Sequence, residues 1–258
     1  MQGLSKVVRI LRQDGLRSLL RRGLGFAYRR GVRPLLPVSG PARLGGVLTC
    51  YGLTVADRYV PRAWLPWWMT DPTGNSSYEA ALVGGLETHV RPGDRVVVIG
   101  GGIGVTAVNA ALRTGPSGYV TCFEGSLDNC RLVGRTAALN GVANLTVRHA
   151  VVGSSIAVYG SLSGRGEVLP AAELPPCDVL ELDCEGAEIR IIREMTIRPR
   201  VLLVETHGVH GSPTQEVAAA MEACDYAVSD LGWAEPSQEE TCRLNDIRVL
   251  SGVRRAAP

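Results

Sequence analysis

The chain has 258 residues, 45% of them hydrophobic, a length that suits one full-sized α/β domain with a short extra segment. It contains no apolar run of about 18 residues or more, so no membrane-spanning helix is expected. Arginines interrupt every apolar run near the N-terminus, which argues against a secretory signal and favours a cytoplasmic location. Seven scattered cysteines form no C-x-x-C pair, a pattern typical of free thiols in a reducing compartment and not of structural zinc.

Charge is unevenly distributed along the chain. Ten of the 27 Lys and Arg residues, but one of the 25 Asp and Glu residues, lie within residues 1–45, so the remainder has a net charge of −7. Between these arginines, Leu and Val recur at helical spacing over 4–24, which predicts an amphipathic helix. The basic arm has three open interpretations: a helix packed on the domain, a peripheral membrane contact through residues 1–30, or nucleic-acid binding. The last has no support from an aromatic-interleaved basic patch, so a nucleic-acid partner is not expected.

The chain is predicted to divide into a basic helical arm and Pro/Gly-rich linker at 1–47, an irregular lid segment at 48–76 and a main domain at 77–258. The lid holds Trp64, Trp67 and Trp68, which either stack on a sugar or pack the lid. Strands are expected at 95–99, 119–123, 145–149, 179–182, 201–204, 226–229 and 246–250, and helices at 77–90, 104–114, 126–139, 186–195 and 213–223. Residues 153–175 are expected to form a hairpin or loop. No helix is expected between the last two strands, so one of them is expected to be antiparallel. This alternation predicts a Rossmann-like, doubly wound, mostly parallel α/β sheet of about seven strands.

A glycine loop follows the first strand of the main domain. Gly100, Gly102 and Gly104 lie between that strand and a helix, where glycine permits a tight turn and lets a ligand reach the helix N-terminus. The next strand ends in Glu124, whose carboxylate can accept both ribose hydroxyls of an adenosine. Together these features predict an adenine-nucleoside cofactor. The spacing G-x-G-x-G is common in methyltransferases, but Gly102-x-Gly104-x-x-Ala107 also fits a loose dinucleotide pattern, so a nicotinamide- or flavin-dependent oxidoreductase stays open.

A second polar group follows two later strands. The strand at 179–182 leads into Asp183 and Glu185, and a helix opens at Gly186. The next strand ends in Glu205-Thr206-His207. Because ligands bind at the carboxyl ends of strands in an open α/β sheet, these side chains should face the same crevice as the glycine loop.

These motifs resemble the FkbM-type S-adenosylmethionine-dependent methyltransferases over about residues 78–250. The resemblance rests on Tyr78-Glu79, the glycine loop, Phe123-Glu124 followed by Asn129 and Asn140, Asp183-x-Glu185-Gly186-x-Glu188, and Val204-Glu205-Thr206-His207. It implies a class I methyltransferase fold, S-adenosyl-L-methionine as donor, and methyl transfer to a hydroxyl of a sugar, glycan or small metabolite. The cofactor-binding residues it implies are Gly100, Gly102, Gly104, Glu124, Gly125 and Asp183.

The chain departs from the family at three positions. Val98 stands where an acid is common, Gly125 where proline is common, and Glu181 where a basic residue is common. The missing acid at 98 keeps a degenerate, non-catalytic nucleoside-binding module open as an alternative.

Catalysis is expected from His207, Asp183 and Glu185. An alcohol acceptor loses a proton as the new bond forms, and His207 is the first candidate base because imidazole titrates near neutral pH. Asp183 is the second; a structural role stays open for both residues. Glu188 is expected to act on the helix dipole. No metal is assigned, although Asp183, Glu185 and Glu205 could together hold a divalent ion. The acceptor and the oligomeric state are left undetermined.

Overall fold

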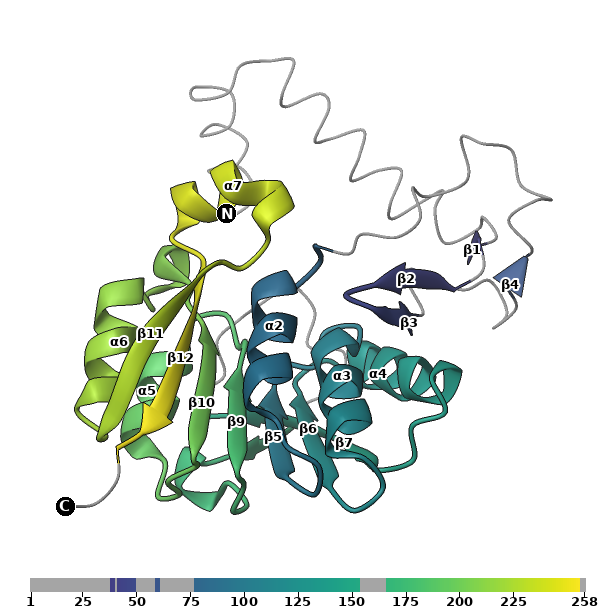
Figure 1. Cartoon of the computed structure of the whole chain (residues 1–258), viewed down its shortest axis with the longest axis horizontal. Coiled ribbons are helices and arrows are strands. Elements are labelled where there is room, and N and C mark those ends of the chain that lie inside the picture. The colour runs from purple at the N-terminus through teal and green to yellow at the C-terminus, as the bar shows by residue number, and fades with distance from the viewer. Residues whose placement is uncertain (1–37, 40, 50–58, 61–76, 154–165, 256–258) are drawn as a thin grey trace. The chain divides into compact units, whose positions relative to one another are not determined.

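The structure is a computed structural model of the chain, and it describes residues 38–39, 41–49, 59–60, 77–153 and 166–255 (Figure 1). The chain divides into two compact units, Met1–Pro41 with Tyr51–Pro72, and Ala42–Cys50 with Thr73–Pro258. In the first unit, β1 (Val38–Ser39) pairs in parallel with β4 (Tyr59–Val60). The helix expected at 4–24, the residues 1–30 for which a membrane contact was one interpretation, and the three tryptophans of the lid lie outside the described residues.

The second unit is built on an eight-stranded sheet with the order β11-β12-β10-β9-β5-β6-β7-β8. Its strands are β5 (Arg95–Ile99), β6 (Tyr119–Glu124), β7 (Leu145–Val152), β8 (Glu167–Leu169), β9 (Val179–Leu182), β10 (Val201–Glu205), β11 (Tyr226–Trp233) and β12 (Arg248–Arg254). Strand β12 is antiparallel to both of its neighbours, and the pairings from β10 through β8 are parallel. The predicted fold, a Rossmann-like and mostly parallel sheet with one antiparallel strand near the C-terminus, is confirmed.

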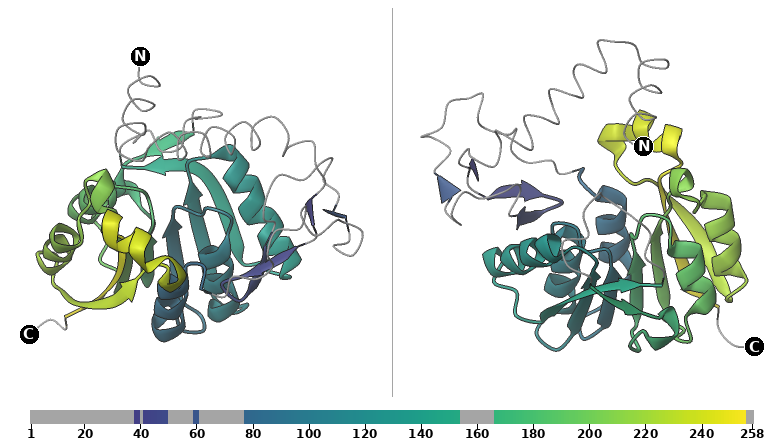
Figure 2. Two further views of the ribbon diagram at one scale, coloured as in Figure 1. Left: turned by 90° about the horizontal axis from the view of Figure 1, so that it is seen from above. Right: turned by 180° about the vertical axis from the view of Figure 1, so that it is seen from behind.

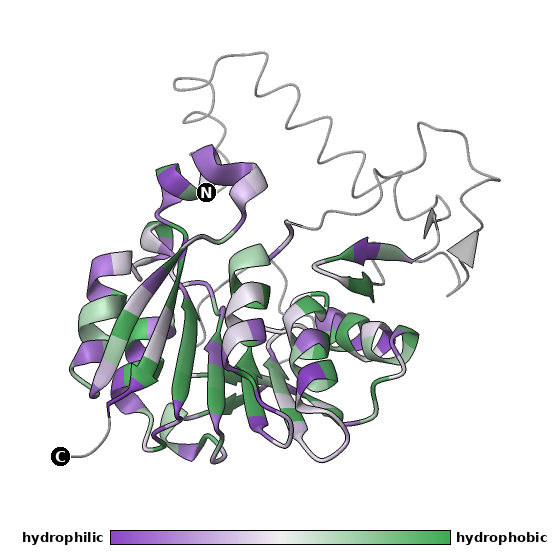
Figure 3. Cartoon of the chain, in the orientation of Figure 1, coloured by the Kyte–Doolittle hydropathy of each residue, from purple (hydrophilic) through white to green (hydrophobic). Residues whose placement is uncertain are grey.

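Helices cover both faces of this sheet (Figures 1 and 2). They are α2 (Ala80–His89), α3 (Val105–Thr114), α4 (Leu127–Leu139), α5 (Glu188–Glu194), α6 (Thr214–Glu222) and α7 (Glu239–Asn245). Side chains of α2, α3 and α4 share one buried cluster with Val96 and Val98, and those of α5 and α6 share another with Val97 and Ile99. Because both faces are covered, the central strands are mainly apolar (Figure 3), although β9 contains one acid, Glu181. Among the described residues, no helix has the length and apolar character needed to cross a bilayer.

Two segments of the main domain differ from the expectation. Residues 167–169, within the expected hairpin or loop, form β8, which pairs in parallel with β7 and adds an eighth strand. A helix, α7, lies between β11 and β12, where none was expected. Cys242 is the one buried side chain of α7. The helix therefore lacks the apolar periodicity that reveals a helix in a sequence.

A short hairpin that crosses the boundary between the expected linker and the expected lid packs on the main domain. It consists of β2 (Ala42–Leu44) and β3 (Val47–Thr49). The side-chain amide of Asn140 donates to the carbonyl oxygen of Leu48 at 2.7 Å, and its oxygen accepts from the Leu48 N–H at 3.1 Å. Leu44 and Val47 join a buried cluster with Val105 of α3. The hairpin therefore covers α3 and α4 close behind the glycine loop.

Candidate functional site

The glycine loop joins β5 to α3 and requires glycine for its backbone. Gly100, Gly102 and Gly104 all have positive φ values, of 96°, 50° and 92°. A Cβ atom on Gly100 would overlap the carbonyl oxygen of Asp183, so the loop passes directly against the end of β9. At Gly102, by contrast, a Cβ atom would have no neighbour within 4 Å. Gly100 thus permits the close contact between the glycine loop and the end of β9, and Gly102 leaves open space beside the backbone.

Glu124, at the end of β6, lies beside this loop as the sequence predicts. Its side chain accepts the N–H of Gly102 at 2.9 Å and the N–H of Ser126 at 2.7 Å. Glu124 is 7% exposed, and Ser126 is the N-cap of α4. The carboxylate therefore connects the glycine loop to the start of α4, and it retains acceptor capacity for hydroxyl groups because an ionised carboxylate has about four lone-pair sites. Gly125 follows at the same edge, with its carbonyl oxygen 3.1 Å from Nε2 of His149.

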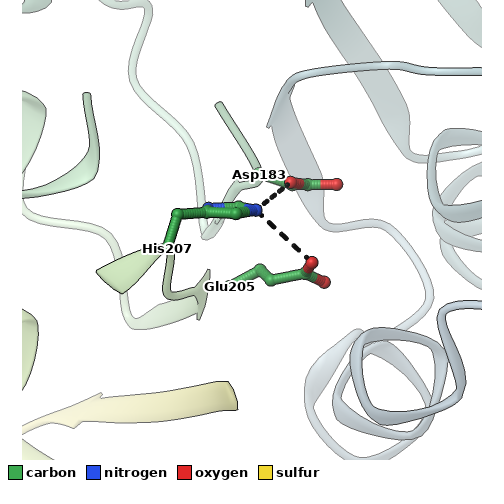
Figure 4. Close-up of side chains that lie close together, drawn as sticks. All are labelled: Asp183, Glu205 and His207. Atoms are coloured by element: carbon green, nitrogen blue, oxygen red, sulfur yellow. Dashed lines mark ion pairs between the residues drawn. The ribbon is translucent and has the colours of Figure 1, made fainter. Parts of the chain in front are cut away.

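Asp183, Glu205 and His207 come together at the carboxyl ends of β9 and β10 (Figure 4). The backbone N–H of Asp183 donates to the carbonyl oxygen of Ile99, which fixes this residue beside the glycine loop. Nε2 of His207 lies 3.5 Å from Oδ1 of Asp183 and 3.5 Å from Oε1 of Glu205. The structure thus brings the two predicted groups, glycine loop and strand-end acids, to one edge of the sheet.

His207 is held by Glu188, a residue whose predicted role was confined to the helix dipole. Nδ1 of His207 lies 3.0 Å from Oε1 of Glu188, and the two side chains are 3% and 0% exposed. Burial alone would lower the pKa of His207, but the carboxylates of Glu188, Glu205 and Asp183 outweigh it and raise the pKa to about 11. Burial alone would raise the pKa of Glu188, but the His207 contact and the Gly186 N–H lower it to about 2. At neutral pH the pair is therefore an imidazolium and a carboxylate.

Glu185 has a strained backbone conformation and lies beside this group of side chains. Its φ of 56° lies in the left-handed region, which is uncommon for a residue other than glycine. Its Oε2 atom lies 3.2 Å from Nε2 of His210, a side chain that is 45% exposed, and 3.8 Å from Nε2 of His207. Glu185 therefore lies between the buried imidazole and an exposed one, and backbone strain of this kind clusters at functional sites.

Two further carboxylates were not recognised in the sequence as part of the site. Glu181 is fully buried on β9, and neither of its carboxylate oxygens makes a well-formed hydrogen bond among the described residues, although the Thr106 side chain lies nearby. Burial raises the pKa of Glu181 to about 8. Burial and the charges of Glu181 and Glu205 raise the pKa of Glu79 well above its usual value. An acid inside the apolar run 178–182 was the available signal, because a buried strand position seldom holds a carboxylate without a function.

The site therefore concentrates carboxyl groups where the predicted ligands would bind. Burial and the charge of Glu205 raise the pKa of Asp183 well above its usual value. Glu181 pairs in register with Val98 on β5, so an acid stands directly across from the position where the resembling family usually has one. His207 is the buried cationic group that the described residues supply to this cluster. Such an arrangement favours binding of a cation.

Comparison with known proteins found similarity to solved structures. No family model and no curated protein matches the chain. Among solved structures, the ribosomal protein L11 methylase from Lactobacillus delbrueckii subsp. bulgaricus has a TM-score of 0.49 at 14% identity, with 71% of this chain and 81% of that one covered. The YcgJ protein from Bacillus subtilis has a TM-score of 0.46 at 15% identity, over 69% and 99%.

A third solved structure, a SAM-dependent O-methyltransferase from Thermotoga maritima, has a TM-score of 0.46 at 14% identity, over 70% of this chain and 65% of that one. Identities this low transfer neither an activity nor a substrate to the chain. The functional conclusion is therefore drawn from the site's own residues.

Proposed function

We propose that the chain is an S-adenosylmethionine-dependent methyltransferase that methylates a hydroxyl oxygen of a sugar, a glycan or a small metabolite. The observation that carries this proposal is the meeting of Glu124 with Gly102 at 2.9 Å, beside a loop that also touches Asp183. One edge of the sheet thus holds a carboxylate that can accept ribose hydroxyls, a glycine backbone with open space beside it, and an acidic residue at the end of a strand. This set fits an adenosine that bears a positively charged sulfonium.

The residues present fit such a cofactor. Among the described residues, no atom lies within 4 Å of the position a Cβ atom on Gly102 would take, which leaves room for a ligand beside this backbone. The acids at the ends of β9 and β10 attract a cation and not a phosphate, which favours S-adenosylmethionine over a dinucleotide with its anionic pyrophosphate. When bound, this cofactor supplies an electrophilic methyl group and leaves as a neutral thioether.

The chain has to orient the acceptor and remove the proton of its hydroxyl group. His207 is poorly suited to accept that proton, because its Nδ1 is engaged by Glu188 and its Nε2 faces the carboxylates of Asp183 and Glu205. We assign proton acceptance to Glu185, whose contact with the exposed His210 connects it to solvent. Asp183 and Glu205 then orient the acceptor. Most of the rate enhancement is expected from this alignment and from water exclusion, since the methyl donor is reactive by itself.

Membership of the FkbM-type family is part of this proposal. The two most distinctive sequence blocks, Asp183-x-Glu185-Gly186-x-Glu188 and Val204-Glu205-Thr206-His207, contact each other through the Glu188–His207 hydrogen bond. Side chains that lie 19 residues apart in the sequence therefore act as one unit. This gives a physical reason for the two blocks to occur together.

Calorimetric titration of the full chain tests the proposal. We expect S-adenosylmethionine and S-adenosylhomocysteine to bind saturably, one molecule per chain, and NAD⁺ to show no binding at the same concentrations. Binding of NAD⁺ alone would favour the oxidoreductase alternative. Binding of the sulfur compounds without methyl transfer to any of a panel of hydroxylated acceptors would favour a non-catalytic nucleoside-binding module.

A further inference from the structure

The three side chains at the ends of β9 and β10 have the composition and spacing of a metal site. Asp183, Glu205 and His207 each offer one potential ligand atom, and these three atoms all lie within 4.8 Å of one another. Figure 4 shows the imidazole edge turned toward the two carboxylates. Both distances from Nε2 are 3.5 Å, longer than a good hydrogen bond. Ligands bound at right angles to one cation at about 2.1–2.5 Å are about 3.0–3.5 Å apart.

The orientation of His207 is an independent observation that points to a ligand at Nε2. Its Nδ1 is committed to Glu188, and Glu188 is fixed by the N–H groups of Gly186 at 2.9 Å and Cys184 at 3.2 Å. The imidazole is 3% exposed, so Nε2 is a buried polar atom that points into the acidic group without a hydrogen bond of normal length. Metal-bound histidines in proteins usually donate their other ring N–H to a carboxylate, as Nδ1 does here.

The surrounding charge supports the same conclusion. Glu181 is fully buried, and its carboxylate makes no well-formed hydrogen bond in the described part of the chain, although the Thr106 side chain lies close enough to lower its pKa. It lies two residues before Asp183 on β9, on the side of the sheet to which Leu203 and Glu205 of β10 also point. Buried carboxylates this close repel one another unless a cation compensates them.

We propose that Asp183, Glu205 and Nε2 of His207 bind one divalent cation, which displaces the proton from Nε2 while Nδ1 keeps its hydrogen bond to Glu188, the positioning residue for His207. Two carboxylates and one imidazole suit ions such as Mn²⁺, Mg²⁺ or Zn²⁺, and three protein ligands leave coordination positions open. The role of the ion rests on the proposed function. An acceptor hydroxyl bound at an open position becomes more acidic, its proton passes to Glu185, and its oxygen forms the new bond to the methyl carbon as the carbon–sulfur bond breaks.

The test is a metal titration of the full-length chain after treatment with EDTA. Mn²⁺, Mg²⁺ and Zn²⁺ are each added and binding is followed by calorimetry, and for Mn²⁺ also by the loss of the free-ion electron paramagnetic resonance signal. We expect one ion per chain. Asp183→Asn and Glu205→Gln should each weaken binding at least tenfold, and Glu188→Gln should weaken it about 10- to 100-fold. Asp128→Asn is the matched control, because Asp128 is exposed and pairs with Arg131 on α4, and it should bind as the wild type does.

Folding and the proposed function are measured on the same preparations. Circular dichroism reports whether each variant is folded, and S-adenosylhomocysteine titration reports the cofactor pocket separately. Failure of all three ions to bind, or equal binding by folded Asp183→Asn and Glu205→Gln, overturns the metal site. If S-adenosylhomocysteine still binds in that case, the proposed function stands without a metal. If the ion binds and the sulfur compounds do not, the proposed function fails instead.

Discussion

Gly100 and Gly102 provide the sharpest test of the glycine loop, because alanine should mainly lower stability at Gly100 and mainly weaken cofactor binding at Gly102. A Cβ atom on Gly100 would overlap the Asp183 carbonyl oxygen and lie 2.7 Å from its carbonyl carbon. That carbonyl cannot move freely, since the Asp183 N–H donates to Ile99 and the Gly100 N–H donates to Phe123. The strands β5 and β9 would have to separate.

The expected magnitudes follow from these contacts. Alanine in the left-handed region costs about 1–2 kcal/mol, and forcing an extra carbon into a packed site costs about 1–3 kcal/mol more. Gly100→Ala should therefore lose about 2–5 kcal/mol of unfolding free energy, a fall in Tm of roughly 5–15 °C. Gly102→Ala has no overlap and should lose about 1–2 kcal/mol, but its Cβ atom enters the space assigned to the cofactor. We expect it to weaken S-adenosylhomocysteine binding about 10- to 100-fold.

Thermal denaturation and calorimetric titration distinguish these effects. Gly134→Ala is the matched control, because Gly134 lies within α4 with nothing within 4 Å of its Cβ position. It should raise the unfolding free energy by up to about 1 kcal/mol and leave cofactor binding unchanged. The reasoning is refuted if Gly100→Ala melts within about 2 °C of the wild type, or if folded Gly102→Ala binds S-adenosylhomocysteine normally.

Three further substitutions test separate parts of the description. Glu124→Ala should weaken S-adenosylhomocysteine binding about 100-fold, because two hydrogen bonds to a charged acceptor at about 1.5 kcal/mol each are lost; unchanged affinity in a titration would show that the ribose lies elsewhere. Asn140→Ala removes both contacts to Leu48, so hydrogen exchange of the Leu48 amide should accelerate about 5- to 30-fold; an unchanged rate would contradict the anchoring of the hairpin. Tyr226→Phe deletes a hydroxyl that donates to the carbonyl oxygen of Pro199 at 2.8 Å, at the opposite edge of the sheet. Chemical denaturation should show that the unfolding free energy falls by about 1–2 kcal/mol, while the affinity for S-adenosylhomocysteine stays the same. A parallel loss of affinity would show that this end of the sheet is not separate from the cofactor site.

The strands of the sheet could be predicted well from the sequence because the signals that define each strand lie within the strand and the turns beside it. Each strand at the centre is an apolar run that ends in a turn or a polar residue, and the alternation with helices specifies parallel pairing. The positions of Gly100 and Glu124 follow from the same rules. By contrast, β8 lies next to a Gly/Ser-rich stretch, and α7 buries Cys242 alone, so neither carries a periodic signal.

The chemistry of the candidate site could be predicted only in part. Strand topology brought Asp183, Glu185 and His207 to one edge, as expected. The pairing of His207 with Glu188 depends on the path of the chain between β10 and α6, which no local pattern reveals. That contact changes the interpretation of His207, from a base that titrates near neutral pH to a buried group fixed by a carboxylate. The carboxylate of Glu79 joins the site for the same non-local reason, whereas Glu181, an acid within the apolar strand β9, carried a local signal.

A crystal structure of the chain with S-adenosylhomocysteine would test the central claim most directly. We predict that the ribose hydroxyls lie within hydrogen-bond distance of Glu124, that the backbone at Gly102 faces the ligand, and that the sulfur atom points toward Asp183. An adenosine bound away from the ends of β5 and β6, or a sulfur atom directed away from Asp183 and His207, would contradict it.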